Sequence, residues 1–188
     1  MQALNTRQIQ KLRNILKNKI KKNVIDIFII GSALKNKLYP NDLDILVLFR
    51  EKNLKEVEEI LFEIKENINK RDVHIEPLFA DNLFEEKITL TIFHEGFSIK
   101  KNKFISELIK LNSFSIFSFN LENLSKIDKV RFAQALYGRK KDGLLYMEKG
   151  IVLGQGSFMV NVQKEEIFKD FMKKWKIKYF KKKAFVND

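Results

Sequence analysis

The pattern of apolar and polar positions predicts a small α/β unit in the first 80 residues. Apolar residues recur at helical spacing over 6–20, and an apolar run typical of a buried strand covers 24–30. Two further apolar runs, over 43–49 and 73–79, flank a second amphipathic stretch over 54–68. The order helix–strand–turn–strand–helix–strand predicts a small mixed sheet flanked by helices.

The periodicity weakens after residue 82, and the elements predicted there are short. They are a helix over 83–93, a strand over 97–99 and a helix over 104–111. We place a domain boundary in this region, so that residues 1–110 form one domain and residues 111–188 a second. The expected fold class is α/β, with a small α+β domain at the C-terminal end.

The second domain is predicted to combine two amphipathic helices with short strands. The predicted elements are a helix over 124–138, a hairpin or meander among the glycines of 143–156, a helix over 165–175, and edge strands over 177–179 and 184–186. Gly154-x-Gly156-Ser157 could be a phosphate loop, but a hairpin turn is the better interpretation. Phe114, Phe117 and Phe119 alternate with serines, which predicts one aromatic strand face.

Composition limits the chemistry that the chain can use. No cysteine occurs among the 188 residues, which excludes disulfides, cysteine-ligated zinc and thiol nucleophiles. No apolar run approaches the roughly 18 residues of a membrane span. We therefore expect a soluble, cytoplasmic protein without a membrane partner. A monomer is the simplest expectation, because nothing in the sequence specifies an oligomer.

The charge of the chain favours a polyanionic partner. Lysine and arginine number 36 against 24 acidic residues, which gives a net charge of +12. No acid precedes Asp26, so all charged side chains of the first helix are positive. We expect Lys17, Lys21 and Lys174 to contact nucleic acid, although a general bias towards Lys, Ile, Asn and Phe would raise the charge as well.

Two carboxylates open the second predicted strand. Asp42 and Asp44 are two residues apart, so their side chains share one face of a strand, with Cα atoms about 7 Å apart. Such a pair is costly unless a cation lies between the two groups. Glu76, on the third strand, is the candidate third carboxylate, with Asp72 as the alternative. Hard oxygen ligands of this kind suit Mg²⁺.

A glycine-serine turn follows the first predicted strand. Gly31 lets the backbone approach a phosphate, and Ser32 can donate its hydroxyl and its N–H. Gly31-Ser32, then Asp42-Leu43-Asp44, then Glu76 resembles the signature of the polymerase-β-type nucleotidyltransferase superfamily.

That resemblance implies a nucleotidyltransferase palm with a two-metal mechanism. Asp42 and Asp44 would hold two Mg²⁺ ions, with Mn²⁺ as a substitute, and Glu76 would bind the catalytic ion and help to activate the attacking hydroxyl. Gly31, Ser32 and Lys35 would bind the triphosphate of an NTP or dNTP. The implied reaction is attack of a nucleic-acid 3′-hydroxyl on the α-phosphate, with release of pyrophosphate.

The C-terminal half resembles the corresponding domain of small family X DNA polymerases. The segment 116–120 and the following helix look like the parts that contact the incoming nucleotide and the templating base pair. Phe119 and Asn120 would then bind nucleotide and Arg131 would bind nucleic acid, with DNA favoured over RNA. The glycine expected after the aromatic pair is absent, because Leu121 follows Asn120.

Two other function classes remain open. The same chemistry could modify a protein, as in nucleotidyltransferases paired with toxins, or a small molecule. Alternatively, the chain could be a non-catalytic nucleic-acid-binding module. The sequence leaves the sugar, the preferred base and the use of a template undetermined.

Overall fold

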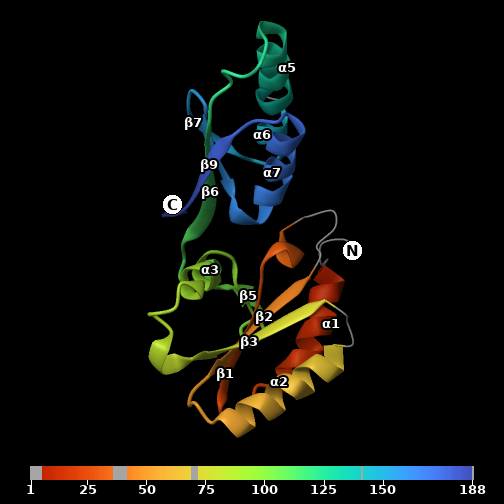
Figure 1. Cartoon of the computed structure of the whole chain (residues 1–188), viewed down its shortest axis with the longest axis vertical. Coiled ribbons are helices and arrows are strands. Elements are labelled where there is room, and N and C mark those ends of the chain that lie inside the picture. Colours follow the sequence, from red (N-terminus) through yellow and green to blue (C-terminus); the bar gives the residue numbers. More distant parts are fainter. Residues whose placement is uncertain (1–5, 36–41, 69–71, 141, 188) are drawn as a thin grey trace. The chain divides into compact units, whose positions relative to one another are not determined.

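The structure is a computed structural model that describes residues 6–35, 42–68, 72–140 and 142–187 (Figure 1). The chain divides into unit 1, Met1–Leu111, and unit 2, Asn112–Asp188. Each unit has its own sheet and its own hydrophobic core, so each is described by itself. The division of roles between a catalytic and a nucleic-acid-binding domain stays a prediction.

Unit 1 contains a five-stranded mixed sheet in the order β3-β2-β1-β4-β5. The strands are β1 (Val24–Ile30), β2 (Leu43–Phe49), β3 (Val73–Phe79), β4 (Phe97–Ser98) and β5 (Lys103–Phe104). β1 pairs antiparallel with β2, whereas β2 pairs parallel with β3. The predicted mixed α/β fold is confirmed, and the three long strands have the bounds expected from their apolar runs.

Alternating side chains give the two faces of this sheet different coverings. Helices α1 (Thr6–Lys17) and α2 (Leu54–Ile68) pack on one face, where Ile29 and Val47 are fully buried. On the other face, Phe28, Ile30, Leu46 and Leu48 pack against Ile92 of helix α3 (Ile88–Glu95), which lies on the far side of the sheet from α1 and α2 in Figure 1.

The region between residues 80 and 111 differs from its prediction. A 3₁₀ turn, η2 (Ala80–Asn82), precedes turns over 83–85, and the helix predicted over 83–93 begins only at Ile88. The hydroxyl of Thr89 donates to the carbonyl of Leu83, which holds the chain in a turn there. The helix predicted over 104–111 is a single turn, α4 (Ile105–Leu108), and Lys110 after it has a φ of 56°.

Unit 2 has an antiparallel four-stranded sheet in the order β7-β8-β6-β9. Its strands are β6 (Asn112–Phe119), β7 (Ile151–Gly154), β8 (Ser157–Asn161) and β9 (Tyr179–Val186). β7 and β8 form the predicted hairpin, with Gln155 and Gly156 at its turn. One edge strand, β9, is found instead of the two predicted ones: it begins at Tyr179, so residues 177 and 178 lie outside it, and it pairs with β6 along its whole length.

Three helices cover one face of this sheet and bury a phenylalanine-rich core. The helices are α5 (Lys126–Tyr137), α6 (Leu144–Met147), which was not predicted, and α7 (Glu165–Lys174). Phe117 and Phe158 stack with ring centroids 5.1 Å apart and pack against Phe168. Phe114 lies on the opposite face, so the predicted single aromatic face was wrong, because residues 114 and 117 differ in strand parity.

A buried carboxylate joins α7 to two strands of unit 2. Glu165 is 1% exposed, accepts a hydrogen bond from the Ser115 hydroxyl at 2.5 Å and pairs with Lys181 at 2.9 Å. Burial alone would lower the pKa of Lys169, but its hydrogen bond with Glu166 and the charge of Glu165 raise that pKa overall.

Within the described ranges, no helix is both long enough and apolar enough to cross a membrane.

Candidate active site

The chain leaves β1 through a turn that only glycine accommodates easily. Gly31 has a φ of 81° and a ψ of −159° and precedes the short 3₁₀ helix η1 (Ser32–Leu34). A Cβ atom built on Gly31 would lie 2.5 Å from the Oδ2 atom of Asp44. The turn therefore passes directly against the Asp44 carboxylate, with no space for a side chain between them.

Replacing Gly31 by alanine is expected to destabilise the protein by about 1–3 kcal/mol, because this backbone region is essentially restricted to glycine. The new methyl group would also displace Asp44. Thermal unfolding measures the loss. Gly154→Ala is the matched control, since its Cβ would meet only the Ser157 Oγ at 3.7 Å. Equal stability of the two variants would contradict the strain assigned to Gly31.

The predicted acidic residues lie at neighbouring positions on one face of the sheet. Asp44 is paired with Ile30 of β1 and with His74 of β3, whereas Glu76 is paired with Leu46, two residue pairs further along. Asp44, His74 and Glu76 line a cavity of about 220 Å³. Asp42 precedes β2 and is half-buried. The structure thus brings Asp44 and Glu76 to one cavity, with Asp42 two residues from Asp44.

Negative charge is concentrated around Asp44. Burial raises the pKa of the Asp44 carboxyl above its usual value, and the charges of Asp42, Glu76 and Glu95 raise it further. His74 acts in the opposite direction and lowers that pKa. A cation beside Asp44 would therefore relieve both the desolvation and the repulsion.

Asp44→Asn is expected to raise thermal stability at neutral pH in the absence of metal. Because folding raises the pKa of Asp44, its contribution to stability is greatest below the unfolded-state pKa, about 3.9, and is lost as pH rises through the higher folded-state pKa. The variant's advantage should therefore disappear in acid. Thermal unfolding in chelator at several pH values measures this, with exposed Asp81→Asn as control. An unchanged midpoint at neutral pH would contradict the prediction.

The side chains of this site have the oxygen donors that suit Mg²⁺, but in the described part of the chain they are not close enough together to coordinate one ion. Asp42, Asp44 and Glu76 offer only carboxylate oxygens, the donors that Mg²⁺ prefers. Within the described part of the chain, however, no three His, Asp or Glu side chains are close enough together to hold a metal ion. Glu76 lies two residue pairs along the strands from the Asp44–His74 pair, which separates it from Asp44. The metal roles of the three acids stay predictions.

Lys35 is not exposed to the cavity as its predicted role in triphosphate binding would require. Its Nζ atom lies 2.5 Å from Oε2 of Glu95, and both side chains are nearly fully buried. The pair ties the end of the Gly31–Ser32 turn to the end of α3. Sequence reasoning missed Glu95 because a carboxylate at the end of a helix carries no signal of a partner 60 positions earlier.

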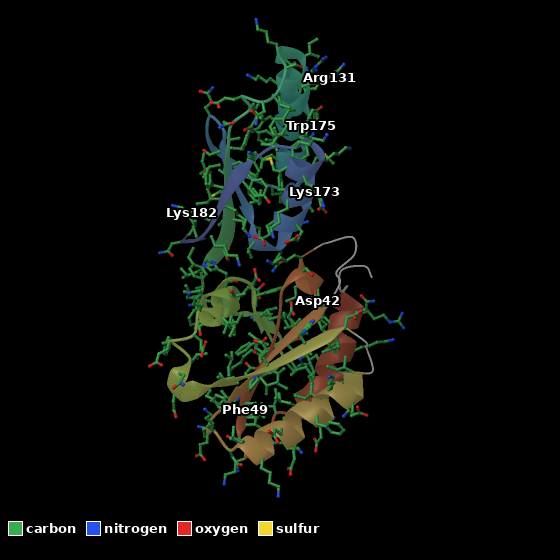
Figure 2. All side chains as sticks on the ribbon, in the orientation of Figure 1. Asp42, Phe49, Arg131, Lys173, Trp175 and Lys182 are labelled. Carbon is green, nitrogen blue, oxygen red and sulfur yellow. The ribbon has the colours of Figure 1, made fainter. Side chains whose placement is uncertain are left out.

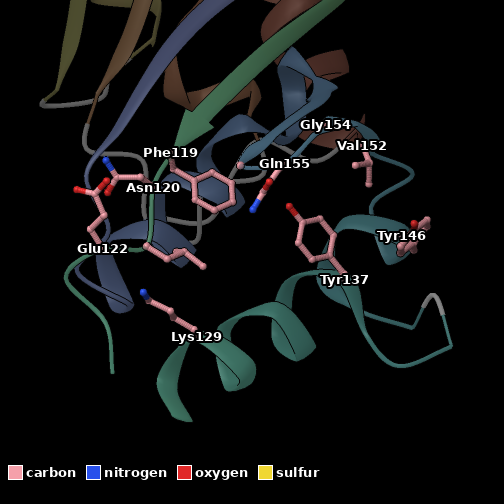
Figure 3. A pocket seen from close by; sticks show the side chains of 11 residues that line it. Phe119, Asn120, Glu122, Lys129, Tyr137, Tyr146, Val152, Gly154 and Gln155 are labelled. Atoms are coloured by element: carbon pink, nitrogen blue, oxygen red, sulfur yellow. The ribbon is translucent and has the colours of Figure 1, made fainter. Parts of the chain in front are cut away.

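In unit 2, Phe119 and Asn120 line a second cavity of about 820 Å³ (Figure 3). Tyr137, Tyr146 and Gln155 also line it, and the sequence analysis did not single them out. The two tyrosines occupy apolar positions of helical segments, where core packing is the ordinary interpretation. Gln155 lies in the β7–β8 turn, so only the folded hairpin brings it close to Phe119.

The predicted nucleic-acid contacts lie on the surfaces of both units. Lys17 and Lys174 are exposed at the ends of α1 and α7. Lys21 lies 3.7 Å from Glu63, and Arg131, labelled in Figure 2 on α5, lies 3.5 Å from Asp128. These exposed pairs contribute little to stability, so they leave the cations accessible to another anion. Their role in binding stays a prediction.

Comparison with known proteins identifies the family of unit 1. No curated protein matches the chain at a significant level. A family model described as "Polymerase beta, Nucleotidyltransferase" matches residues 10–103, which is half of the chain. The match runs from α1 into β5 and includes the Gly31 turn, both strand-opening aspartates and Glu76. The chain therefore belongs to the polymerase-β-type nucleotidyltransferase superfamily.

Proposed function

We propose that this nucleotidyltransferase moves a nucleoside monophosphate from an NTP or dNTP to a nucleic-acid 3′-hydroxyl and releases pyrophosphate. The observation that carries the proposal is the contact of the Gly31 turn with Asp44 beside a cavity that also includes Glu76. A phosphate-binding turn and carboxylates on adjoining strands are the parts that phosphoryl transfer needs. All of them lie within the segment that matches the family model.

Asp42, Asp44 and Glu76 are the residues that would hold two Mg²⁺ ions, with Mn²⁺ as a substitute. When bound, the ions would supply charge stabilisation at the α-phosphate and lower the pKa of the attacking hydroxyl. Gly31 and Ser32 would bind the triphosphate through backbone N–H groups and the serine hydroxyl. Glu76, which is exposed at the cavity, would accept the proton of the 3′-hydroxyl. Lys35 would not contact the nucleotide; its ion pair with Glu95 would hold the Gly31–Ser32 turn in position.

A nucleic-acid acceptor is supported by the charge of the chain. The net charge of +12 attracts a polyanion, and Lys17, Lys174 and Arg131 carry exposed cations in the two units. The resemblance of the C-terminal half to small family X DNA polymerases favours DNA over RNA. Cations that contact phosphates make binding fall steeply with salt, so binding to a DNA oligonucleotide should weaken strongly between low and high ionic strength.

Primer extension tests the proposal. The purified chain is incubated with each labelled NTP and dNTP, with Mg²⁺ or Mn²⁺, on single-stranded, gapped and RNA oligonucleotides. The control is the variant in which Asp42 and Asp44 are both replaced by asparagine. Extension by the native chain but not by the variant would support nucleotidyl transfer to nucleic acid, and the preferred substrate would define the sugar and the need for a template.

Two other results would replace the proposal. Label on a co-purified protein or small molecule, without extension, would identify an enzyme that modifies one of those acceptors. Oligonucleotide binding that is unchanged in the double variant, with no product of any kind, would identify a non-catalytic binding module.

A further inference from the structure

The larger of the two cavities described above is lined by residues of unit 2 alone. Its lining comes from the end of β6, the loop that follows, α5, α6 and the β7–β8 hairpin. Its volume of about 820 Å³ lies within the range of small-molecule sites, roughly 300–1,000 Å³. Since unit 1 contributes no lining residue, the cavity can hold a ligand independently of the carboxylates beside Gly31.

Aromatic rings form much of the cavity wall. The ring of Phe119 is half-buried and is held by edge-on contacts with Phe132 and Phe158, at centroid distances of 5.4 and 6.0 Å. Tyr137 and Tyr146 line the cavity from α5 and α6. Burial raises the pKa of Tyr137, and the nearby Tyr146 raises it further, so the Tyr137 phenol stays neutral and can donate a hydrogen bond. Fixed aromatic faces of this kind stack on flat ligands.

The polar groups of the cavity suit an uncharged ligand with hydrogen-bonding edges. Asn120 and Gln155 each present both a donor and an acceptor. In the view of Figure 3, the Gln155 amide lies between the rings of Phe119 and Tyr137. Lys129 and Glu122 add one charge of each sign, so the charged groups in the lining balance. A triphosphate would require a surplus of cations, which this lining does not have.

We infer that the cavity of unit 2 binds a nucleobase and selects it with side chains of the chain itself. The rings stack on the flat faces of the base, and Asn120 and Gln155 bond to its edge. Only the source of the base depends on the proposed function: it belongs either to the incoming nucleotide or to the terminal nucleotide of the acceptor. In both cases the chain discriminates between bases without reading a template.

Nucleoside binding to the full chain tests this inference. Equilibrium dialysis with each of the common nucleosides, in chelator and without acceptor, isolates base recognition from phosphate and metal binding. We expect one nucleoside to bind more tightly than the others. Gln155→Ala should weaken the binding of that nucleoside about tenfold, which corresponds to about 1.4 kcal/mol, and should reduce the preference for it over the other nucleosides. Gln134→Ala is the matched control, because Gln134 is exposed on α5 and does not line the cavity.

A second variant tests stacking separately from hydrogen bonding. Phe119→Leu keeps an apolar side chain against Phe132 and Phe158, and its fold is checked by thermal unfolding. This variant should weaken the binding of all nucleosides by a similar factor, about fivefold or more. Stacking on an aromatic ring is worth roughly 1–3 kcal/mol per base and depends little on which base it is. The inference is overturned if no nucleoside binds at about 10 mM, a limit near −3 kcal/mol, or if both variants bind like the native chain.

The transfer assay then identifies the source of the base. If Gln155→Ala changes the relative KM values of the NTPs, the incoming nucleotide occupies the cavity. If it changes the dependence on the 3′-terminal base of the acceptor, the acceptor does. Nucleoside binding that persists in a chain without transfer activity would retain this inference and remove the proposed function, so the two can fail separately.

Discussion

Asp44→Asn is expected to lower the rate of nucleotidyl transfer by at least about 1,000-fold, since losing roughly 4 kcal/mol of transition-state stabilisation has this effect. Asp44 is the carboxylate that the Gly31 turn contacts and the one at which the charges of Asp42, Glu76 and Glu95 converge. An amide keeps the shape of the side chain but removes the charge that a divalent cation requires. Single-turnover primer extension at saturating nucleotide measures the effect on the chemical step.

A thermal-shift measurement separates a metal-binding defect from a folding defect. Mg²⁺ should raise the unfolding temperature of the native chain, because a ligand that binds only the folded state stabilises it. The same ion should shift Asp44→Asn much less and Asp81→Asn by the native amount. Full transfer activity in Asp44→Asn would mean that the reaction does not require the Asp44 carboxylate. An equal Mg²⁺ shift in all three proteins would place the metal elsewhere.

Lys35→Met is expected to reduce the free energy of unfolding by about 3–5 kcal/mol, because it leaves a buried carboxylate without its cation. The Lys35 and Glu95 side chains are only 7% and 6% exposed, so water cannot replace the lost partner. The destabilisation should be concentrated in unit 1, where the pair joins the Gly31–Ser32 turn to α3. Urea unfolding followed by circular dichroism measures it.

Two further variants make this prediction specific. Lys21→Met removes a lysine that lies 3.7 Å from Glu63, with side chains 57% and 44% exposed, and should be far milder than Lys35→Met. Lys35→Met combined with Glu95→Met should recover most of the lost stability, because two apolar side chains can replace a buried ion pair. If Lys35→Met were as mild as Lys21→Met, the buried pair would not anchor the turn.

Much of unit 1 could be predicted from local pattern. The runs 24–30 and 43–49 are apolar because both faces of β1 and β2 are largely covered by helices, whereas β3 is covered mainly on one side; the bounds of all three runs match the sheet. Asp42 and Asp44 stood out because two carboxylates with one residue between them open the run 43–49, whereas Asp26 and Glu76 are single carboxylates within their runs. Short-range spacing was sufficient for these features, because the bounds of a strand and the Asp42–Asp44 spacing depend only on residues close in sequence.

The features that local pattern missed depend on contacts between distant residues. Lys35 looked like a phosphate-binding lysine, and only the fold reveals its pairing with Glu95, 60 positions later. The helix predicted over 83–93 failed because Leu83 is held in a turn by a side-chain hydrogen bond from Thr89. The unit 2 cavity combines residues from four separate elements, β6, α5, α6 and β7, with a loop and a turn between them, and no periodicity marks such a set.

The position of β9 also bears on how the protein behaves at high concentration. In the described part of the chain β9 is the edge strand of its sheet and pairs with β6, and an edge strand is the place where a strand of a second molecule could add to a sheet. Lys181, Lys182 and Lys183 lie in the middle of this strand, with neighbouring side chains on opposite faces. Lys181 pairs with Glu165 at 2.9 Å, whereas Lys182 is on the opposite face, so edge-to-edge pairing of two copies would bring mainly their Lys182 side chains together. We therefore expect Lys182 to oppose self-association through this edge, an effect that weakens as salt screens the repulsion.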